Sequence, residues 1–172
     1  MFRNSEIALE DLPDMEDLDW QPMHPSYVRR MQAERLIISL IVLAGSALPY
    51  IVVGSEFAPT VPISVLVIVF AIPFLGWPLV SVPRRGYVVR DHDIVFRSGV
   101  FWRSVSAVPF NRVQHVETSN TPLDRKFGLA NLQIFTAGGS GGDLTVSGLG
   151  ADVAEQLRVY VLDKVGGSIE NH

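Results

Sequence analysis

The chain has 172 residues, of which 48% are hydrophobic, 19% are charged and none is a cysteine. The absence of cysteine excludes disulfides, thiol catalysis and thiolate metal sites. Residues 1–25 hold seven acids and one base, which leaves 13 bases and 11 acids in residues 26–172 out of the total net charge of −4. This near balance lacks the basic excess that is typical of a nucleic-acid-binding surface, so we expect no nucleic-acid partner.

The acidic N-terminal segment, residues 1–28, is predicted to be a largely disordered cytoplasmic tail, because it carries seven acids against one base. Its acidic start also differs from a cleavable signal peptide, which begins with basic residues. Near its end, Trp20, Met23 and Tyr27 are apolar anchors. They lie either on the membrane surface or on the following domain, and the acidic stretch with its interspersed Leu, Met and Trp is also a candidate partner peptide.

Two long apolar runs, Leu36–Val53 and Val61–Val82, contain no charged residue. As helices they would reach roughly 27 Å and 33 Å at about 1.5 Å per residue, and the hydrocarbon core of a bilayer is about 30 Å thick. We therefore predict a transmembrane helical hairpin in residues 29–83, with helices at about 36–53 and 61–82. Because these runs hold no Asp, Glu, Lys, Arg or His, they favour an anchor that contacts membrane lipids over a transport path.

The basic residues on either side of the apolar runs predict the orientation of the hairpin. The loop between the runs carries a single charge, Glu56. Cytoplasmic loops are enriched in Lys and Arg, so both termini are expected in the cytoplasm of a multi-pass protein of the cell membrane. The flanking arginines are Arg29, Arg30, Arg35, Arg84 and Arg85.

After the hairpin, residues 84–167 show short segments with period-2 alternation, which predicts six strands in an antiparallel sandwich or barrel. In Asp152–Val165, apolar residues recur at helical spacing, so a closing helix is expected, with Gly166 and Gly167 ending it and residues 168–172 forming a disordered tail. The predicted strands are Gly86–Arg90, Ile94–Ser98, Phe101–Val108, Arg112–Thr118, Asn131–Ala137 and Leu144–Ser147.

Three stretches of this region, Val108–Glu117, Pro122–Leu132 and Phe135–Gly139, resemble bacterial pleckstrin-homology-like (PH-like) membrane proteins of the YdbS-like group. The resemblance covers Trp20 to Val165. It implies a two-helix transmembrane hairpin plus a small, mainly antiparallel β PH-like domain closed by a C-terminal α-helix. Such a domain has seven strands, so a further strand is expected within Phe101–Thr118. Members of the group are generally treated as non-catalytic, membrane-tethered modules.

One candidate contact loop consists of Arg125, Lys126 and Phe127, where two bases adjoin an aromatic residue. If the ring is exposed, this combination suits an anionic lipid surface. In the alternative, Phe127 packs into the domain edge and Arg125 pairs with Asp124. The resemblance weakens any phosphoinositide interpretation, because PH domains hold such headgroups with bases in the first hairpin, where this chain has the acidic turn 91–93.

A second candidate patch consists of Arg112, His115 and Glu117. Strand alternation predicts that His115 and Glu117 share a face with Val113, while Arg112 lies on the other face. We consider a binding patch for a partner or lipid, a pH-sensitive contact, and a structural network that ties the sheet to the next loop.

Two further motifs are interpreted as turns. Residues 138–142 match G-x-S-x-G, but that nucleophile motif requires a strand-to-helix turn, and here it joins two predicted antiparallel strands. Asp91, His92 and Asp93 are adjacent and cannot all reach one metal ion without strain, which favours a solvated turn. We therefore expect no catalytic residue, cofactor or metal.

The chain is thus predicted to be a non-catalytic scaffold or adaptor for a membrane-protein partner or for self-association. The alternative is binding or sensing of anionic lipid headgroups by the PH-like domain.

Overall fold

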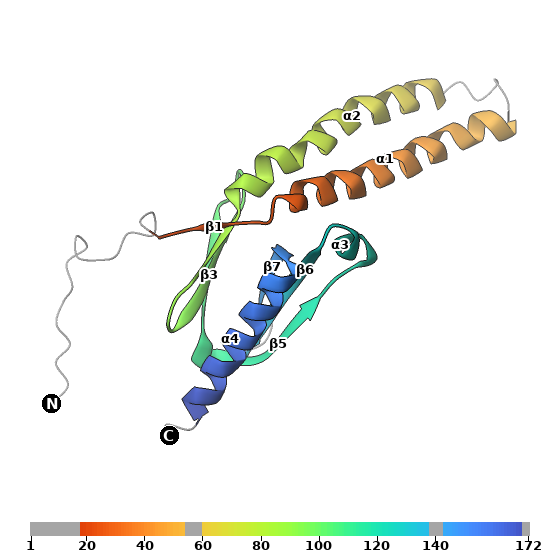
Figure 1. Ribbon diagram of the computed structural model, residues 1–172. Helices are drawn as coiled ribbons and strands as arrows, with labels where there is room; N and C mark the ends of the chain where they lie inside the picture. Colours follow the sequence, from red (N-terminus) through yellow and green to blue (C-terminus); the bar gives the residue numbers. More distant parts are fainter. Residues whose placement is uncertain (1–17, 54–59, 138–142, 170–172) are drawn as a thin grey trace.

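The computed structural model describes residues 18–53, 60–137 and 143–169 of the chain. Two long helices lie side by side and extend from a small β domain, with the C-terminal helix on the side of the domain (Figure 1). The arrangement confirms the predicted fold class, a helical hairpin followed by a mainly antiparallel domain that a helix closes.

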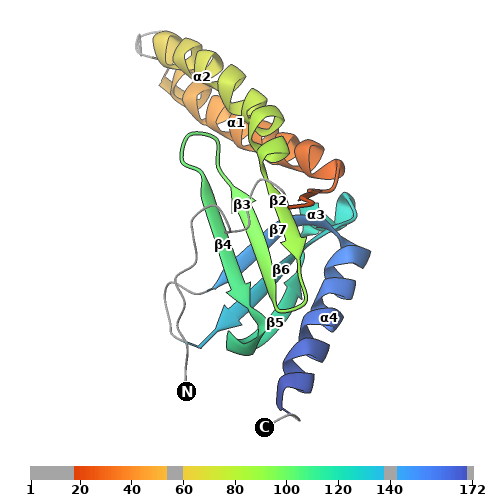
Figure 2. The ribbon, with the colours of Figure 1, turned by 90° about the vertical axis from the view of Figure 1, so that its left-hand side faces the viewer.

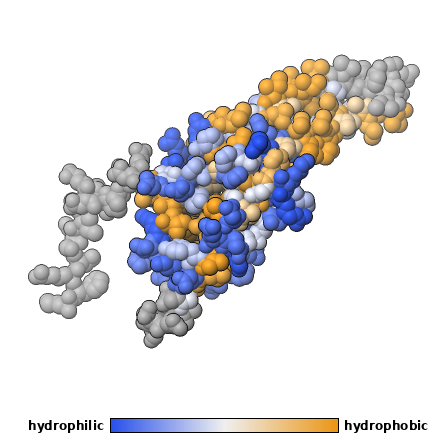
Figure 3. Space-filling view, viewed as in Figure 1, coloured by the Kyte–Doolittle hydropathy of each residue, from blue (hydrophilic) through white to orange (hydrophobic). Residues whose placement is uncertain are grey.

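The hairpin consists of α1 (Ser26–Val53) and α2 (Thr60–Ser81). Both are long and apolar enough to cross a membrane, and their apolar side chains are largely exposed rather than buried within the protein. Figure 3 shows this apolar surface extending from a mostly hydrophilic domain. Exposed apolar helices of this length are stable only in lipid, so the hairpin contacts the membrane.

Helix α1 starts ten residues before the predicted boundary at residue 36. Residues 26–35 are polar enough to be missed by a search for apolar runs, but they are helical because one face packs against the domain. Tyr27 is buried there and Arg29 is exposed. The first turns of α1 therefore belong to the domain.

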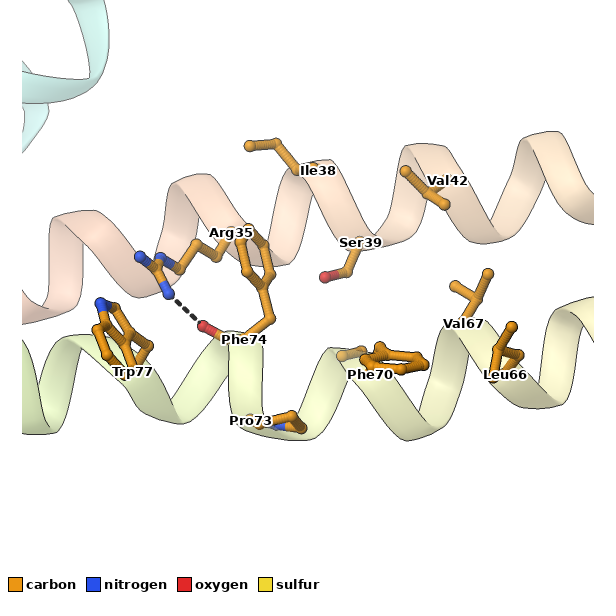
Figure 4. A pocket seen from close by; sticks show the side chains of 11 residues that line it. Arg35, Ile38, Ser39, Val42, Leu66, Val67, Phe70, Pro73, Phe74 and Trp77 are labelled. Carbon is orange, nitrogen blue, oxygen red and sulfur yellow. Dashed lines mark hydrogen bonds between the residues drawn. The ribbon is translucent and has the colours of Figure 1, made fainter. Parts of the chain in front are cut away.

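Helix α2 continues through Pro73 and Pro78. Pro78 has no N–H group, so it cannot donate to the carbonyl of Phe74, four residues earlier. The guanidinium of Arg35 donates to this carbonyl instead, and it lies 4.6 Å from the centre of the Phe74 ring (Figure 4). One arginine thus joins the two helices and satisfies the backbone group that the proline leaves without a donor.

The domain contains two antiparallel sheets. In the first, the strand order is β1-β2-β3-β4, and in the second it is β5-β6-β7. The bounds are β1 Gln21–Pro22, β2 Gly86–Val89, β3 Asp93–Ser98, β4 Ser104–Pro109, β5 Val113–Ser119, β6 Leu129–Thr136 and β7 Leu144–Gly150. Short 3₁₀ turns, η2 (Val82–Arg84) and η3 (Phe110–Arg112), follow α2 and β4, and the short helix α3 (Pro122–Lys126) follows β5.

The seventh strand is β1, which precedes the hairpin. Gln21 pairs with Tyr87 and Pro22 with Gly86, so the chain enters the first sheet, leaves it through the two membrane helices and returns to the neighbouring strand. The expectation of a strand within Phe101–Thr118 beyond those predicted is wrong. Residues from about 20 onward also lie in the domain, so the acidic tail ends earlier than the predicted boundary at residue 28.

The core lies between the sheets and α4 (Ala151–Ile169). Ile94, Leu132, Ile134 and Val161 are fully buried there. Helix α4 packs against β5, β6 and β7 (Figure 2). The prediction that Gly166 ends this helix is wrong, since a glycine costs an exposed helix only about 1 kcal/mol.

Candidate functional site

The domain-facing end of the hairpin is fixed to the domain by Tyr27. Its ring is 6% exposed and lies against Gly148 of β7, where a Cβ atom would come 2.4 Å from the ring. The tyrosine hydroxyl accepts a hydrogen bond of 3.1 Å from Arg85, which directly follows η2. One residue thus connects the start of α1, the sheet and the segment that leaves α2.

Asp124 forms a second connection between hairpin and domain. It is the third residue of α3 and is 2% exposed. One carboxylate oxygen accepts from Arg30 Nε at 2.7 Å, and the other accepts from the amide and hydroxyl of Thr121 at 2.9 and 2.7 Å. Asn131 adds a longer contact of 3.4 Å to the same oxygen as Thr121. The buried carboxylate therefore has a basic partner on α1 and a helix cap on α3.

The pKa of Asp124 reflects these partners. Burial by itself favours the neutral acid and would raise the pKa, but the hydrogen bonds from Thr121 and the charge of Arg30 outweigh it and hold the pKa below its usual value. The carboxylate is therefore ionised at neutral pH, as a buried ion pair with Arg30 requires.

The predicted contact loop lies beside this ion pair. Arg125 and Lys126 are exposed at the end of α3, whereas Phe127 is half-buried and packs against the core. The aromatic ring is thus not free to enter a membrane, and Asp124 pairs with Arg30 rather than with Arg125. Phe127 therefore packs into the domain edge, as the alternative interpretation predicts. Only Arg125 and Lys126 form an exposed surface.

The second predicted patch is divided by a β-bulge. The register of β5 against β6 shifts between Val113 and His115, so Val113 is buried while His115 is exposed. The prediction that they share a face is wrong, because a bulge inserts an extra residue into the alternation. His115 Nε2 lies 3.5 Å from Glu117 Oε2, and the centre of the His115 ring lies 5.7 Å from the centre of the Phe135 ring. Arg112 is exposed in η3 and does not join them.

Two exposed features were not identified as sites from the sequence. The β3–β4 loop presents Phe101 and Trp102, which are 77% and 87% exposed. Strand β4 is exposed from Ser104 to Ala107 at the edge of its sheet. The sequence pattern predicts the aromatic loop and β4 as one strand, Phe101–Val108. Aromatic and β-branched residues favour strands, and no polar run separates the loop from β4.

The remaining motifs do not form a chemical centre among the described residues. No group of three or more His, Asp or Glu side chains in that part of the chain is placed to hold a metal ion. In the 91–93 turn, Asp93 pairs instead with Arg90, whose Nε donates at 2.6 Å. The G-x-S-x-G motif lies outside the described residues.

A groove of about 680 Å³ runs along the lipid-facing side between α1 and α2 (Figure 4). Apolar side chains such as Phe70 and Val42 line most of it, and Arg35 and Trp77 lie at its domain-facing end. In a bilayer, this surface contacts lipid.

Comparison with known proteins agrees with this architecture. The family model of the bacterial PH domain matches residues 33–165, which is more than half of the chain. The chain belongs to the bacterial PH domain family. The match begins before the first apolar run, so it includes the membrane hairpin as well as the domain.

A relative in Bacillus subtilis (strain 168), the UPF0699 transmembrane protein YdbS, is 47% identical over 51 residues. This segment covers 30% of the present chain and 32% of YdbS, so the match spans about a third of that protein. The comparisons confirm the resemblance to YdbS-like bacterial PH membrane proteins and support a membrane location. No solved structure matches the chain significantly.

Proposed function

We propose that this bacterial PH protein is a non-catalytic, membrane-anchored adaptor whose domain binds an extended segment of a protein partner along β4. The observation that carries this proposal is the exposed and uncharged edge of the first sheet. The arginines that flank the hairpin support an orientation in which both termini and the domain are cytoplasmic. The partner would therefore be bound at the inner surface of the cell membrane.

Strand β4 has the properties of a strand-addition site. It pairs with β3 on one side, and no strand among the described residues pairs with it on the other. The residues Ser104–Ala107 are all exposed, and none carries a charge or lacks a backbone N–H group. Proteins usually protect such an edge with charges, proline or bulges, because its unpaired backbone groups attract another strand.

The other edges of the two sheets are protected. Strand β5 has a bulge at Val113 and exposed charge at Glu117. On β7, the backbone carbonyl of Gly148 accepts a hydrogen bond of 3.0 Å from the amide of His24. Strand β1 is only two residues long. Among these edges in the described residues, only β4 is longer than two residues and lacks a charge, a bulge and a covering segment. It is therefore the favoured binding surface.

Lysines at two exposed positions of β4 test this proposal. In the full chain purified from its native membrane, Val105→Lys with Ala107→Lys should remove a copurifying protein by placing two charges on the contact strand. The matched control, Gln156→Lys with Val159→Lys, adds the same charges to an exposed face of α4 and should retain the partner. If the partner is a second copy of the chain, differently tagged copies will copurify. Equal recovery from both variants would contradict binding at β4.

Anionic lipid binding is the second candidate. Helix α3 packs against α1, which keeps the exposed Arg125 and Lys126 near the membrane hairpin. Two bases near a surface attract anionic headgroups in a salt-dependent manner.

Hydrogen exchange in the reconstituted full chain tests this alternative. The amides of α3 should exchange more slowly in vesicles with phosphatidylglycerol than in vesicles of phosphatidylcholine, and high salt should remove the difference. Arg125→Ala with Lys126→Ala should abolish it, whereas Arg158→Ala on α4 should leave it unchanged. Identical exchange in both lipids would reject headgroup binding.

A further inference from the structure

The tip of the β3–β4 hairpin exposes two large aromatic side chains. Phe101 and Trp102 are 77% and 87% exposed. Their rings lie edge to face, with 6.4 Å between the ring centres. Water disfavours such apolar surface, and adjacent exposed aromatic residues at a loop tip are typical of a contact site. Their position indicates which contact they make.

The tip lies at the level where the hairpin meets the membrane. The centre of the Phe101 ring is 5.7 Å from the centre of the Trp77 ring in α2. Trp77 is in the turn after Phe74, whose carbonyl binds Arg35, the last charged residue before the apolar run of α1. Arg35 and Trp77 are residue types that favour the boundary between headgroups and hydrocarbon. The loop therefore reaches this boundary beside α2 (Figure 2).

The backbone of the loop holds the tip in this position. Ser98 pairs with Ser104, so the residues between them close a short turn. Gly99 has a φ of 111°, and a Cβ atom there would lie 1.8 Å from the carbonyl oxygen of Trp102. Only glycine fits this conformation, so the turn that presents the aromatic pair is defined by the sequence.

We infer that the β3–β4 loop is a separate membrane-contacting element, which inserts Phe101 and Trp102 into the leaflet that adjoins the domain. The proposed occupant of this surface is lipid, because the loop continues the lipid-facing surface of α2 through Trp77. Arg103 follows the aromatic pair and is exposed, as is common where a wedge enters a negatively charged surface. The domain then contacts the bilayer at a site separate from the hairpin, and this contact sets the direction in which β4 faces.

Spin-label accessibility in the full chain tests this inference, because a chain without cysteine accepts a single label at a chosen position. Arg103→Cys places the nitroxide beside the intact aromatic pair. His92→Cys places it in the exposed β2–β3 turn, at the opposite end of β3 from the β3–β4 loop (Figure 2). The protein is reconstituted alone in vesicles of phosphatidylcholine and phosphatidylglycerol, so that no heterologous partner protein can cover the loop. Collisions with oxygen report lipid, and collisions with a water-soluble nickel chelate report water.

The label at residue 103 should show the high oxygen and low nickel accessibility of the lipid boundary. The label at residue 92 should show the low oxygen and high nickel accessibility of water. Adding Phe101→Ser and Trp102→Ser to the Arg103→Cys chain should shift the first label to water, and the same pair should leave the label at 92 unchanged if the domain is folded. Water-like accessibility of residue 103 in the intact loop would overturn the inference. So would a lipid-like signal that persists without the two aromatic rings.

Discussion

Replacing Asp124 with alanine should lower the thermal unfolding temperature of the full chain in detergent by roughly 6–12 °C. The change removes the buried partner of the Arg30 guanidinium, which keeps only Glu34 on its own helix, and removes the Asp124 half of the capping box of α3. Breaking a buried ion pair costs about 3 kcal/mol or more, and for a chain of this size each kcal/mol corresponds to about 2–4 °C. The loss should also speed hydrogen exchange in α3 and in the first turns of α1.

The matched control is Glu155→Ala, which breaks the exposed pair between Glu155 and Arg158 on α4. Exposed ion pairs contribute little to stability, so the unfolding temperature of this variant should stay near that of the wild type. Equal effects of the two substitutions would show that Asp124 does not connect the domain to the hairpin.

The same pair predicts a dependence on pH. Because the pKa of Asp124 is lower in the folded than in the unfolded chain, its contribution is fully present above the unfolded value, about 3.9, and is lost as the pH falls through the folded value. The difference in unfolding temperature between the wild type and Asp124→Ala should therefore be constant near neutral pH and should shrink below about pH 4. A difference that grew on acidification would contradict this assignment of charge.

Gly148→Ala should detach Tyr27 from β7 and destabilise the chain by about 3 kcal/mol, through strain at a positive φ and loss of ring packing. The backbone there has a φ of 84°, and the added Cβ would lie 2.4 Å from the ring. Thermal unfolding measures the loss. Hydrogen exchange should show faster exchange in residues 23–27.

Gly128→Ala is the control, since Gly128 also has a positive φ, 68°, but nothing lies within 4 Å of the added Cβ. It should cost only the conformational strain, about 1 kcal/mol. If both variants are destabilised equally, packing of Tyr27 against Gly148 does not hold the hairpin to the domain.

The sequence predicts the parts of the fold that carry a strong local signal. The two apolar runs indicate the hairpin because length and hydropathy suffice for a membrane helix. Four of the six predicted strands coincide with β2, β3, β5 and β6 within two residues at each end, and a fifth, Leu144–Ser147, covers only the first part of β7 (Leu144–Gly150). The sixth, Phe101–Val108, begins at Ser104 in the structure, because the residues before it form the turn at Gly99.

Long-range pairing and irregular geometry could not be predicted. Strand β1 has two residues, too few for any periodicity, and its partner β2 lies beyond both membrane helices. The exposure of His115 depends on a bulge, which reverses the alternation without a mark in the sequence. The cap of α3 was predictable in principle, since Thr121 and Asp124 have the spacing of a capping box with a proline at the first helical position.

The contacts between the hairpin and the domain bear on the proposed adaptor function. Tyr27 and the Arg30–Asp124 pair connect the domain to α1, and the hydrogen bond from Arg85 to Tyr27 ties in the segment that follows α2. An adaptor fixed in this way presents β4 in one direction relative to the membrane, rather than swinging on a linker.

Photocrosslinking in native membranes is the sharpest test of whether the domain binds a protein partner along β4. A photoreactive amino acid at Ser106, in the exposed middle of β4, should give a specific protein adduct, and the same group at the exposed Gln156 of α4 should not. Adding Val105→Lys and Ala107→Lys should remove the adduct at Ser106. An absence of protein adducts at Ser106, or equal adducts at both positions, would contradict an adaptor that binds its partner along β4.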